Sequence, residues 1–338
     1  MSRPRRPTRQ RDAIARPWRV WLAENLLRGV PPEPLAAALV AHGVPPLLAA
    51  RGLREAAREP GLVAARKHQR LLERQALAAR LHRAVALPLA IERRSTPPAD
   101  EFHARYYATN TPVIFTDLVP RWPAFTRWSA AHLRDHYGAA EIEIQVGRAS
   151  DPAPDLNYLQ HRQLSTMAQY VDKVLAAGET NDLYLIANSR NLARPALRPL
   201  LADVELPADY FHPDRERQAR SSALWFGPAG TVTALHHDTS SILLAQVVGR
   251  KRLHLYPPGD PTLLAHASGV YNTLDPERPG PELAGVPVLD LTLAPGEALF
   301  LPVGWWHHVR ALDLSISLAC NHFRWPNDHD WYKPGALR

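Results

Sequence analysis

The sequence predicts a mainly β protein, in which a barrel or jelly-roll core is surrounded by helices and preceded by a helical segment. From about residue 220 to 323 the chain carries short runs of alternating apolar and polar residues, separated by Gly and Pro turns. Few helical patterns interrupt them, and this texture is typical of β-barrels and jelly rolls. Residues 17–95 instead show the helical period, so we expect them to form a separate element.

Prolines and glycines divide the N-terminal part of the chain. We expect residues 1–16 to be a disordered basic tail and residues 17–95 to be a helical accessory segment. The stretches "RPWRVWLAENLLRG" and "PPEPLAAALVAHG" indicate two short helices, because each ends at a glycine and the second begins with prolines. A longer helix is predicted over residues 61–85. The stretch "PLAIERRSTPPADEF" then reads as a linker into the main domain, residues 96–338.

The charge of the chain is uneven. Residues 1–95 hold 19 of the 40 Lys and Arg but only 7 of the 33 Asp and Glu, which gives them a net charge of +12 and leaves −5 for the rest. Such a segment can bind nucleic acid, but no nucleic-acid motif accompanies it, so we favour solvated arginine faces on the helices. Homodimer formation or substrate capture by these helices remains open beside simple packing on the barrel.

Composition excludes several classes of protein. The single cysteine, Cys320, cannot form an internal disulfide or a Cys-rich zinc site. No apolar run reaches the length of a membrane span, and the N-terminal arginines are not followed by the apolar run of a secretory signal. We therefore expect a cytoplasmic protein with no membrane partner.

The main domain begins with three short predicted strands, in "TPVIFTDL", "AEIEIQVGR" and "DLYLIANS". The barrel follows a Pro- and Asp-rich stretch. Its strands are predicted within four segments: "SSALWFGPAGTVTALHHD", "SILLAQVVGRKRLHLYPP", "VPVLDLTLAPGEALFLPVGWWHHV" and "LSISLACNHF".

One pattern in the barrel has the geometry of a metal site. Residues i and i+2 of a strand point to one face, so His236 and Asp238 converge while His237 points away. An imidazole and a carboxylate are two of the three ligands with which proteins hold non-haem Fe(II), and "LPVGWWHHV" offers His307 or His308 as the third. Taken alone, the pair is equally consistent with a structural hydrogen bond.

Two further features favour a site around this pair. Lys251 is one of only four lysines and falls on the apolar face of "KRLHLY", where its charge needs an anion such as the distal carboxylate of a small dicarboxylate. In the last strand Ser315, Ser317, Ala319 and Asn321 share one face, and small or polar residues there leave room for a ligand. The alternatives are a lysine that reaches water and a solvent-facing strand.

Two other patterns are interpreted as structural. A second His-x-Asp, His212 to Asp214, lies between a Pro-rich stretch and "RERQAR", which indicates a surface loop. Trp225, Trp305 and Trp306 would wall a site between the strands, but we favour packing in the core for them.

Three motifs together resemble a known family. "TVTALHHD", "QVVGRKRLHLYPP" and "PGEALFLPVGWWHHVRALDLSIS", in this order and spacing, resemble the JmjC/cupin-like oxygenases that use Fe(II) and 2-oxoglutarate, in particular bacterial cupin-like (Cupin_8) proteins. The resemblance covers about residues 100–325. It implies a double-stranded β-helix core, a catalytic domain over residues 96–338, Fe(II) and O2, and 2-oxoglutarate as cosubstrate.

The resemblance also implies a role for each matching residue. The iron ligands are two residues of the first motif and the histidine directly after the Trp pair: His236, Asp238 and His307. The residues implied to contact 2-oxoglutarate are Lys251, Thr233 and Tyr184 at its distal carboxylate, and Asn321 nearby.

One position departs from the family pattern. Relatives commonly carry Asn four residues after the Asp ligand, and this chain has Ile242 there, with Ser241 pointing to the other face. The resemblance implies hydroxylation of a residue in a protein or peptide substrate. N-methyl demethylation and small-molecule hydroxylation use the same site and stay open. The Ile242 departure also keeps open a non-enzymatic cupin-like binding protein.

Overall fold

The computed structural model describes residues 13–86 and 90–327. The chain divides into two compact units, residues 1–85 and 86–338. Most of the predicted basic tail, residues 1–12, lies outside the described residues. No helix among the described residues combines the length and apolar content needed to cross a membrane.

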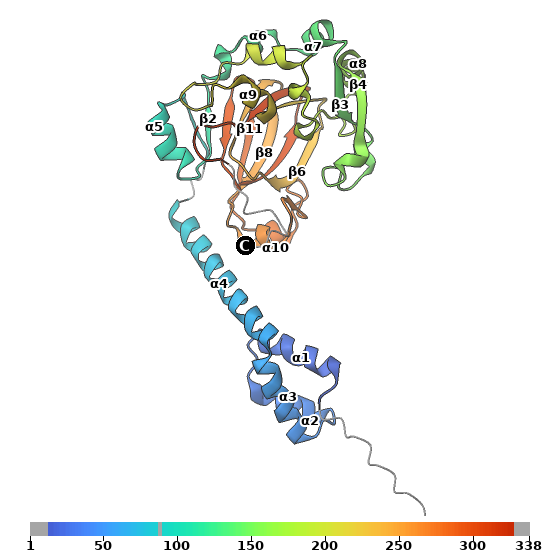
Figure 1. The fold of residues 1–338 in the computed structure, drawn as a ribbon, viewed down its shortest axis with the longest axis vertical. Helices are drawn as coiled ribbons and strands as arrows, with labels where there is room; N and C mark the ends of the chain where they lie inside the picture. Colours follow the sequence, from blue (N-terminus) through green and yellow to red (C-terminus); the bar gives the residue numbers. More distant parts are fainter. Residues whose placement is uncertain (1–12, 87–89, 328–338) are drawn as a thin grey trace, which may run out of the picture. The chain divides into compact units, whose positions relative to one another are not determined.

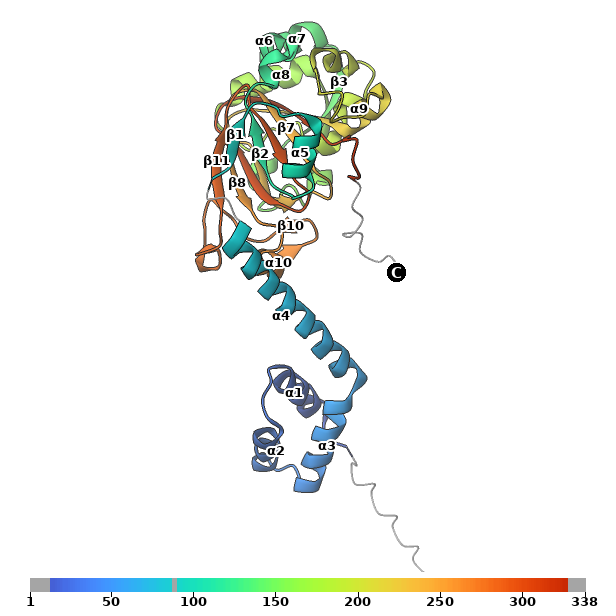
Figure 2. The ribbon, with the colours of Figure 1, turned by 90° about the vertical axis from the view of Figure 1, so that its left-hand side faces the viewer.

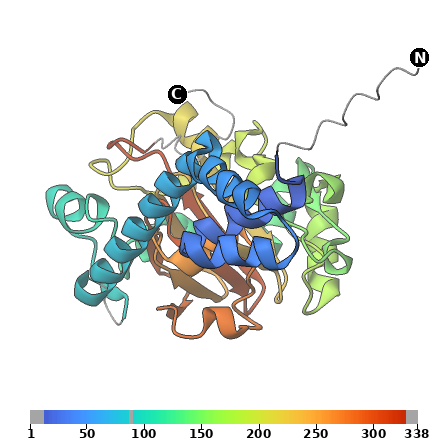
Figure 3. The ribbon, with the colours of Figure 1, turned by 90° about the horizontal axis from the view of Figure 1, so that it is seen from below.

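The first unit is built from helices, whose bounds are α1 Arg16–Leu27, α2 Pro32–Ala41, α3 Pro46–Arg58 and α4 Pro60–Ala86. The first three pack around Leu22, Leu39 and Leu53 in a small bundle (Figures 2 and 3). The α3 helix is not individually predicted, because Gly52 interrupts its pattern. Gly52 serves packing instead: a Cβ there would come within 2.7 Å of Ile14 Cδ1.

The second unit is built on two six-stranded sheets (Figure 1). The first has the order β1-β2-β12-β7-β14-β5, and its strands are β1 Glu92–Arg94, β2 Val113–Phe115, β12 Ala298–Leu301, β7 Ile242–Val248, β14 Ser315–Cys320 and β5 Ser222–Gly227. The second has the order β11-β8-β13-β6-β10-β9, and its strands are β11 Leu289–Leu293, β8 Lys251–Tyr256, β13 Trp306–Ala311, β6 Val232–His237, β10 Tyr271–Asn272 and β9 Ala267–Ser268. A hairpin of β3 Glu141–Gln145 and β4 Arg162–Thr166 stands apart.

Short helices surround the sheets, with bounds α5 Ala99–Phe102, α6 Pro123–Arg127, α7 Ala130–Tyr137, α8 Met167–Ala177, α9 Arg215–Ser221 and α10 Pro261–Ala265. The outer face of the first sheet contributes Phe115, Phe226 and Phe300 to a core shared with these helices. Alternate residues such as Leu244, Leu253 and Leu299 fill the space between the sheets. Their burial excludes water from the barrel.

The predicted fold class, a mainly β barrel or jelly roll with surrounding helices, is confirmed. Two local predictions are wrong. "DLYLIANS" forms only single bridges from Tyr184 and Leu185 before a 3-10 turn, because it crosses between β3 and β5 rather than running along either. The stretch interpreted as a linker contains β1, which pairs in parallel with β2.

Candidate active site between the sheets

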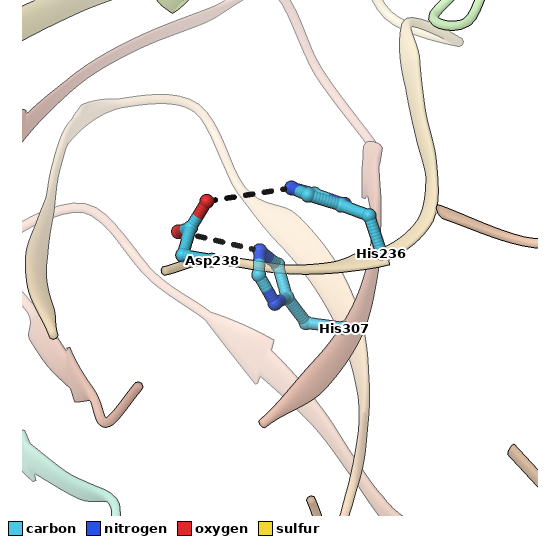
Figure 4. Close-up of side chains that lie close together, drawn as sticks. All are labelled: His236, Asp238 and His307. Atoms are coloured by element: carbon cyan, nitrogen blue, oxygen red, sulfur yellow. Dashed lines mark ion pairs between the residues drawn. The ribbon is translucent and has the colours of Figure 1, made fainter. Parts of the chain in front are cut away.

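Three side chains converge on the inner face of the second sheet: His236 in β6, Asp238 directly after it, and His307 in β13 (Figure 4). His236 Nε2 lies 3.9 Å from Asp238 Oδ1, and His307 Nε2 lies 3.9 Å from Asp238 Oδ2. The ligand atoms of all three lie within 4.8 Å of one another. Two imidazoles and one carboxylate are the donor set of the facial triad that holds non-haem Fe(II).

Strand pairing brings the two histidines together. His307 lies directly opposite His236 in the antiparallel β6–β13 ladder, and their ring centroids are 4.0 Å apart. The register then shifts: Val309 lies opposite Thr233, so β6 has one more residue than β13 over this stretch. This bulge places Thr233 and His236, three positions apart, on one face, which strict alternation would forbid.

Hydrogen bonds fix the tautomer of both histidines. Nδ1 of His236 lies 2.8 Å from the carbonyl oxygen of Ala234, and Nδ1 of His307 lies 2.9 Å from that of Trp305. A carbonyl oxygen only accepts, so Nδ1 donates in both rings, and Nε2 of the neutral imidazole keeps its lone pair towards Asp238.

The electrostatics of the triad suit a cation. Burial, and then the neighbouring His236, keep the pKa of His307 well below its ordinary value, so its imidazole is neutral, as a metal ligand must be. Burial raises the pKa of Asp238, because its ionised form is poorly solvated there. A bound cation would supply the positive charge that this carboxylate lacks. The three residues therefore fit a divalent metal.

A cavity of about 190 Å³ has the triad in its wall. The other predicted site residues line the same cavity: Tyr184, Thr233, Lys251 and Asn321. The structure thus brings every predicted site residue together around one space, although they are spread along the chain from position 184 to 321.

Lys251 is the most unusual group in this cavity. It is 2% exposed, its Nζ lies 5.7 Å from the centre of the Trp225 ring, and no carboxylate among the described residues pairs with it. Burial lowers its pKa to about 7. An unpaired buried ammonium is costly, so the cavity favours an anionic ligand.

The tryptophans divide between the cavity and the core. Trp225 lines the cavity, so its interpretation as core is corrected. Trp305 and Trp306 are packed in hydrophobic clusters on the two faces of the sheet, as the sequence favours. The two tryptophans are consecutive residues, so their rings lie on opposite faces of the sheet.

A buried ion pair beside β6 holds the backbone around Thr233, and the sequence does not predict it. Fully buried Arg148 lies 2.9 Å from Asp155 and donates to the backbone carbonyl before Thr233 at 2.9 Å. The second Asp155 oxygen accepts from the N–H after Thr233 at 2.8 Å. The Arg148 guanidinium also lies 5.6 Å from the ring centre of Tyr184, whose hydroxyl interacts with Thr233.

Only part of the predicted small-residue face of β14 leaves room for a ligand. Ala319 and Asn321 line the cavity. Ser315 and Ser317 instead hydrogen-bond with buried Gln246, at 3.0 and 2.8 Å, and fill the barrel at that level.

The departure at Ile242 is visible in the cavity wall, which this side chain lines. Ser241 points away, as alternation predicts, and its Oγ accepts from the backbone of Val303 at 3.1 Å. Ser240 and Asn321 also line the cavity and are joined by a hydrogen bond of 3.2 Å.

The neighbouring histidines lie on the outer face of the sheet. His237 contacts the Trp306 ring at 4.6 Å between centroids, and His308 faces His254 at 5.8 Å. The second His-x-Asp is structural, since Asp214 caps α9 by accepting from two backbone N–H groups at 2.9 and 3.3 Å.

His308 also belongs to a second group of metal-ligand types, with Asp275 and Glu277. Both acids already pair with arginines, Asp275 with Arg278 at 2.9 Å and Glu277 with Arg310. These ion pairs satisfy the carboxylates, which distinguishes this group from the triad on the inner face.

Comparison with known proteins agrees with this architecture. Residues 98–328 match the family model described as a cupin-like domain. The chain is 31% identical over 250 residues to lysine-specific demethylase JMJ30 of Arabidopsis thaliana and 30% identical over 239 residues to lysine-specific demethylase 8 of Danio rerio. It is 26% identical over 262 residues to the bifunctional peptidase and (3S)-lysyl hydroxylase JMJD7 of Homo sapiens.

These matches cover 70%, 68% and 68% of this chain and 55%, 57% and 82% of the three relatives. The chain thus spans little more than half the length of the two demethylases. The family model covers more than two thirds of the chain, so the chain belongs to the JmjC/cupin-like family, and the resemblance carried by its three motifs is confirmed.

Proposed function

We propose that this chain is an Fe(II)- and 2-oxoglutarate-dependent oxygenase that hydroxylates a residue in a protein or peptide substrate. The observation that carries the proposal is the combination within one cavity of a His-Asp-His triad and a buried lysine that lacks a carboxylate partner among the described residues. A metal-binding protein without cosubstrate would gain nothing from the lysine, whose burial is costly.

In this proposal His236, Asp238 and His307 hold the iron through two Nε2 atoms and a carboxylate oxygen. Bound Fe(II), together with 2-oxoglutarate and O2, supplies the oxidising chemistry that hydroxylates a C–H bond and releases succinate and CO2. Lys251 pairs with the distal carboxylate of 2-oxoglutarate, and Thr233 and Tyr184 donate hydrogen bonds to it. Apolar residues of the cavity wall, such as Leu244 and Leu301, exclude water.

The relatives support a protein substrate, because they are named for action on lysine: two as demethylases and one as a (3S)-lysyl hydroxylase. Both reactions begin with hydroxylation of a C–H bond, and on an N-methyl group the product loses formaldehyde. Demethylation is therefore the second candidate, and it uses the same residues in the same roles.

The test is to add Fe(II) and then 2-oxoglutarate to the full chain without oxygen, and to record the metal-to-ligand charge-transfer absorption. We expect the band in the wild type and its loss in Lys251→Ala. Arg252→Ala is the matched control, because Arg252 is the next residue of β8 and pairs with Asp290 on the outer face. Iron that binds without the band would contradict the proposed cosubstrate. Succinate formation after oxygen is admitted then tests turnover.

A further inference from the structure

A second groove, of about 670 Å³, adjoins the cavity that holds the triad. The two spaces share Ser221, Thr239, Ser240 and Asn321 in their walls. We call this space the entrance groove. A peptide that places one side chain beside His236 and Asp238 would bring its neighbouring residues to this groove, because the two spaces share these four residues.

The entrance groove carries positive charge. Arg217 of α9 and Arg324 line it and are exposed, and no Asp or Glu among the described residues lines it. Neither arginine forms an ion pair within residues 13–86 and 90–327, whereas many others in this unit do, such as Arg250 with Asp313. Two unpaired guanidinium groups on one groove favour a ligand with carboxylates.

His322 lies in the wall of the entrance groove. It is only 3% exposed, and its Nδ1 has no hydrogen-bond partner among the described residues. A buried polar atom without a partner is destabilising, and native structures rarely keep one without a reason. Because Nδ1 of His322 is closed off from solvent, the attraction of the groove for a ligand comes from the two exposed arginines.

Another groove of the unit, of about 910 Å³, shows the opposite arrangement. It is rich in acids, and three of them pair with arginines: Asp155 with Arg148, Asp275 with Arg278, and Glu277 with Arg310. It also shares no lining residue with the triad cavity. Its charges are therefore largely neutralised within the protein, while those of the entrance groove are left for a partner.

We propose that the entrance groove binds an acidic segment of the protein substrate, with Arg217 and Arg324 pairing with Asp or Glu side chains that flank the target residue. This deepens the proposed function and rests on it for the position of the target residue. The net charge of −5 outside residues 1–95 makes the groove a local feature rather than part of a generally basic surface.

The test uses two synthetic peptides of equal length, (Glu-Gly)4 and (Lys-Gly)4, and the full chain loaded with Mn(II) in place of iron. Mn(II) broadens the NMR signals of a peptide that binds near it, so the signal reports binding close to the triad. We expect broadening of the Glu peptide, none of the Lys peptide, and none with Zn(II).

The double variant Arg217→Ser/Arg324→Ser should weaken binding of the Glu peptide roughly tenfold, because two exposed ion pairs are lost. Arg220→Ser is the matched control, since Arg220 lies exposed on the same helix but does not line the groove, and it should bind as the wild type does. Equal broadening in the double variant, or by the Lys peptide, would overturn the inference.

Mn(II) binding by the wild type is measured first through water relaxation. Its absence would contradict the proposed function. In that case fluorescence anisotropy with labelled (Glu-Gly)4 still decides on the groove: a loss of affinity confined to the double variant supports an acidic ligand, and unchanged affinity refutes it.

Discussion

The two faces of the second sheet carry the same types of residue in different surroundings. Three strands each place an inner residue beside an outer counterpart: His236 and His237, His307 and His308, Lys251 and Arg252. On the inner face the two histidines converge on Asp238, and the lysine has no carboxylate partner among the described residues. On the outer face the histidines pack on rings and the arginine pairs with Asp290 at 2.6 Å.

The difference teaches which histidines and cations have a ligand to bind. On the outer face Arg252 pairs with Asp290, and the two acids near His308, Asp275 and Glu277, already pair with arginines. The polar groups on the inner face instead line one cavity of about 190 Å³, where the lysine has no carboxylate partner among the described residues. The type of residue therefore does not identify the ligand-binding groups here, whereas the face of the sheet on which each residue lies does.

The largest effect is expected for the third ligand and its neighbour. His307→Ala should weaken binding of Mn(II) or Fe(II) roughly a hundredfold or more, since changes to residues behind a ligand alone cost 10–100-fold. His308→Ala should leave metal affinity unchanged, because its ring lies on the outer face. Isothermal titration calorimetry on both variants measures this. An equal loss in the two would show that the faces do not divide as described.

The second contrast is Lys251→Ala against Arg252→Ala. Loss of the buried ammonium leaves the distal carboxylate of 2-oxoglutarate unpaired, which should weaken its binding by about 3 kcal/mol, or roughly a hundredfold. Arg252 is about half exposed and its ion pair is on the surface, so its loss should not change cosubstrate affinity. The charge-transfer band, titrated with 2-oxoglutarate, gives both constants. Wild-type affinity in Lys251→Ala would remove the lysine from the site.

Much of this contrast is predictable from the sequence, because strand alternation is a local rule. Alternation alone separates Lys251 from Arg252 and His236 from His237. Alternation also places His307 and His308 on opposite faces, but it does not show which of the two faces is the inner one. That choice rested on the family resemblance, and the pairing of His307 with His236 is a property of register between distant strands.

The features that the sequence does not predict all depend on tertiary contacts. The bulge in β6 breaks the period of two and brings Thr233 to the face of His236. The Arg148–Asp155 ion pair joins an irregular segment to the back of β6, and no short motif encodes it. Gln246 hydrogen-bonds with Ser315 and Ser317 and occupies the space inside the barrel that the polar face of β14 was expected to leave for a ligand.

A smaller effect is expected from pH. Burial lowers the pKa of Lys251 from 10.5 to about 7 in the protein without cosubstrate, whereas 2-oxoglutarate pairs with the protonated amine. As the pH rises above 7, a proton must be taken up on binding, so affinity should fall roughly tenfold from pH 6.5 to pH 8. Titration of the Zn(II)-loaded chain in two buffers of different ionisation enthalpy measures both the affinity and the proton uptake. A flat profile, or affinity that rises with pH, would mean that the amine stays charged without the ligand.

The smallest effect tests the one departure inside the cavity. Ile242→Asn should change the dissociation constant of 2-oxoglutarate only about twofold, because an added hydrogen bond contributes roughly 1 kcal/mol and is offset by burying an amide beside apolar neighbours. Leu244 and Leu301 lie in the same wall, and the Ser240–Asn321 hydrogen bond already supplies polar groups. Ile242→Leu serves as the control for a change of shape. Tighter binding by tenfold or more in Ile242→Asn, but not in Ile242→Leu, would show that the wild-type cavity lacks a polar contact to 2-oxoglutarate. A binding role without turnover would then explain this chain better.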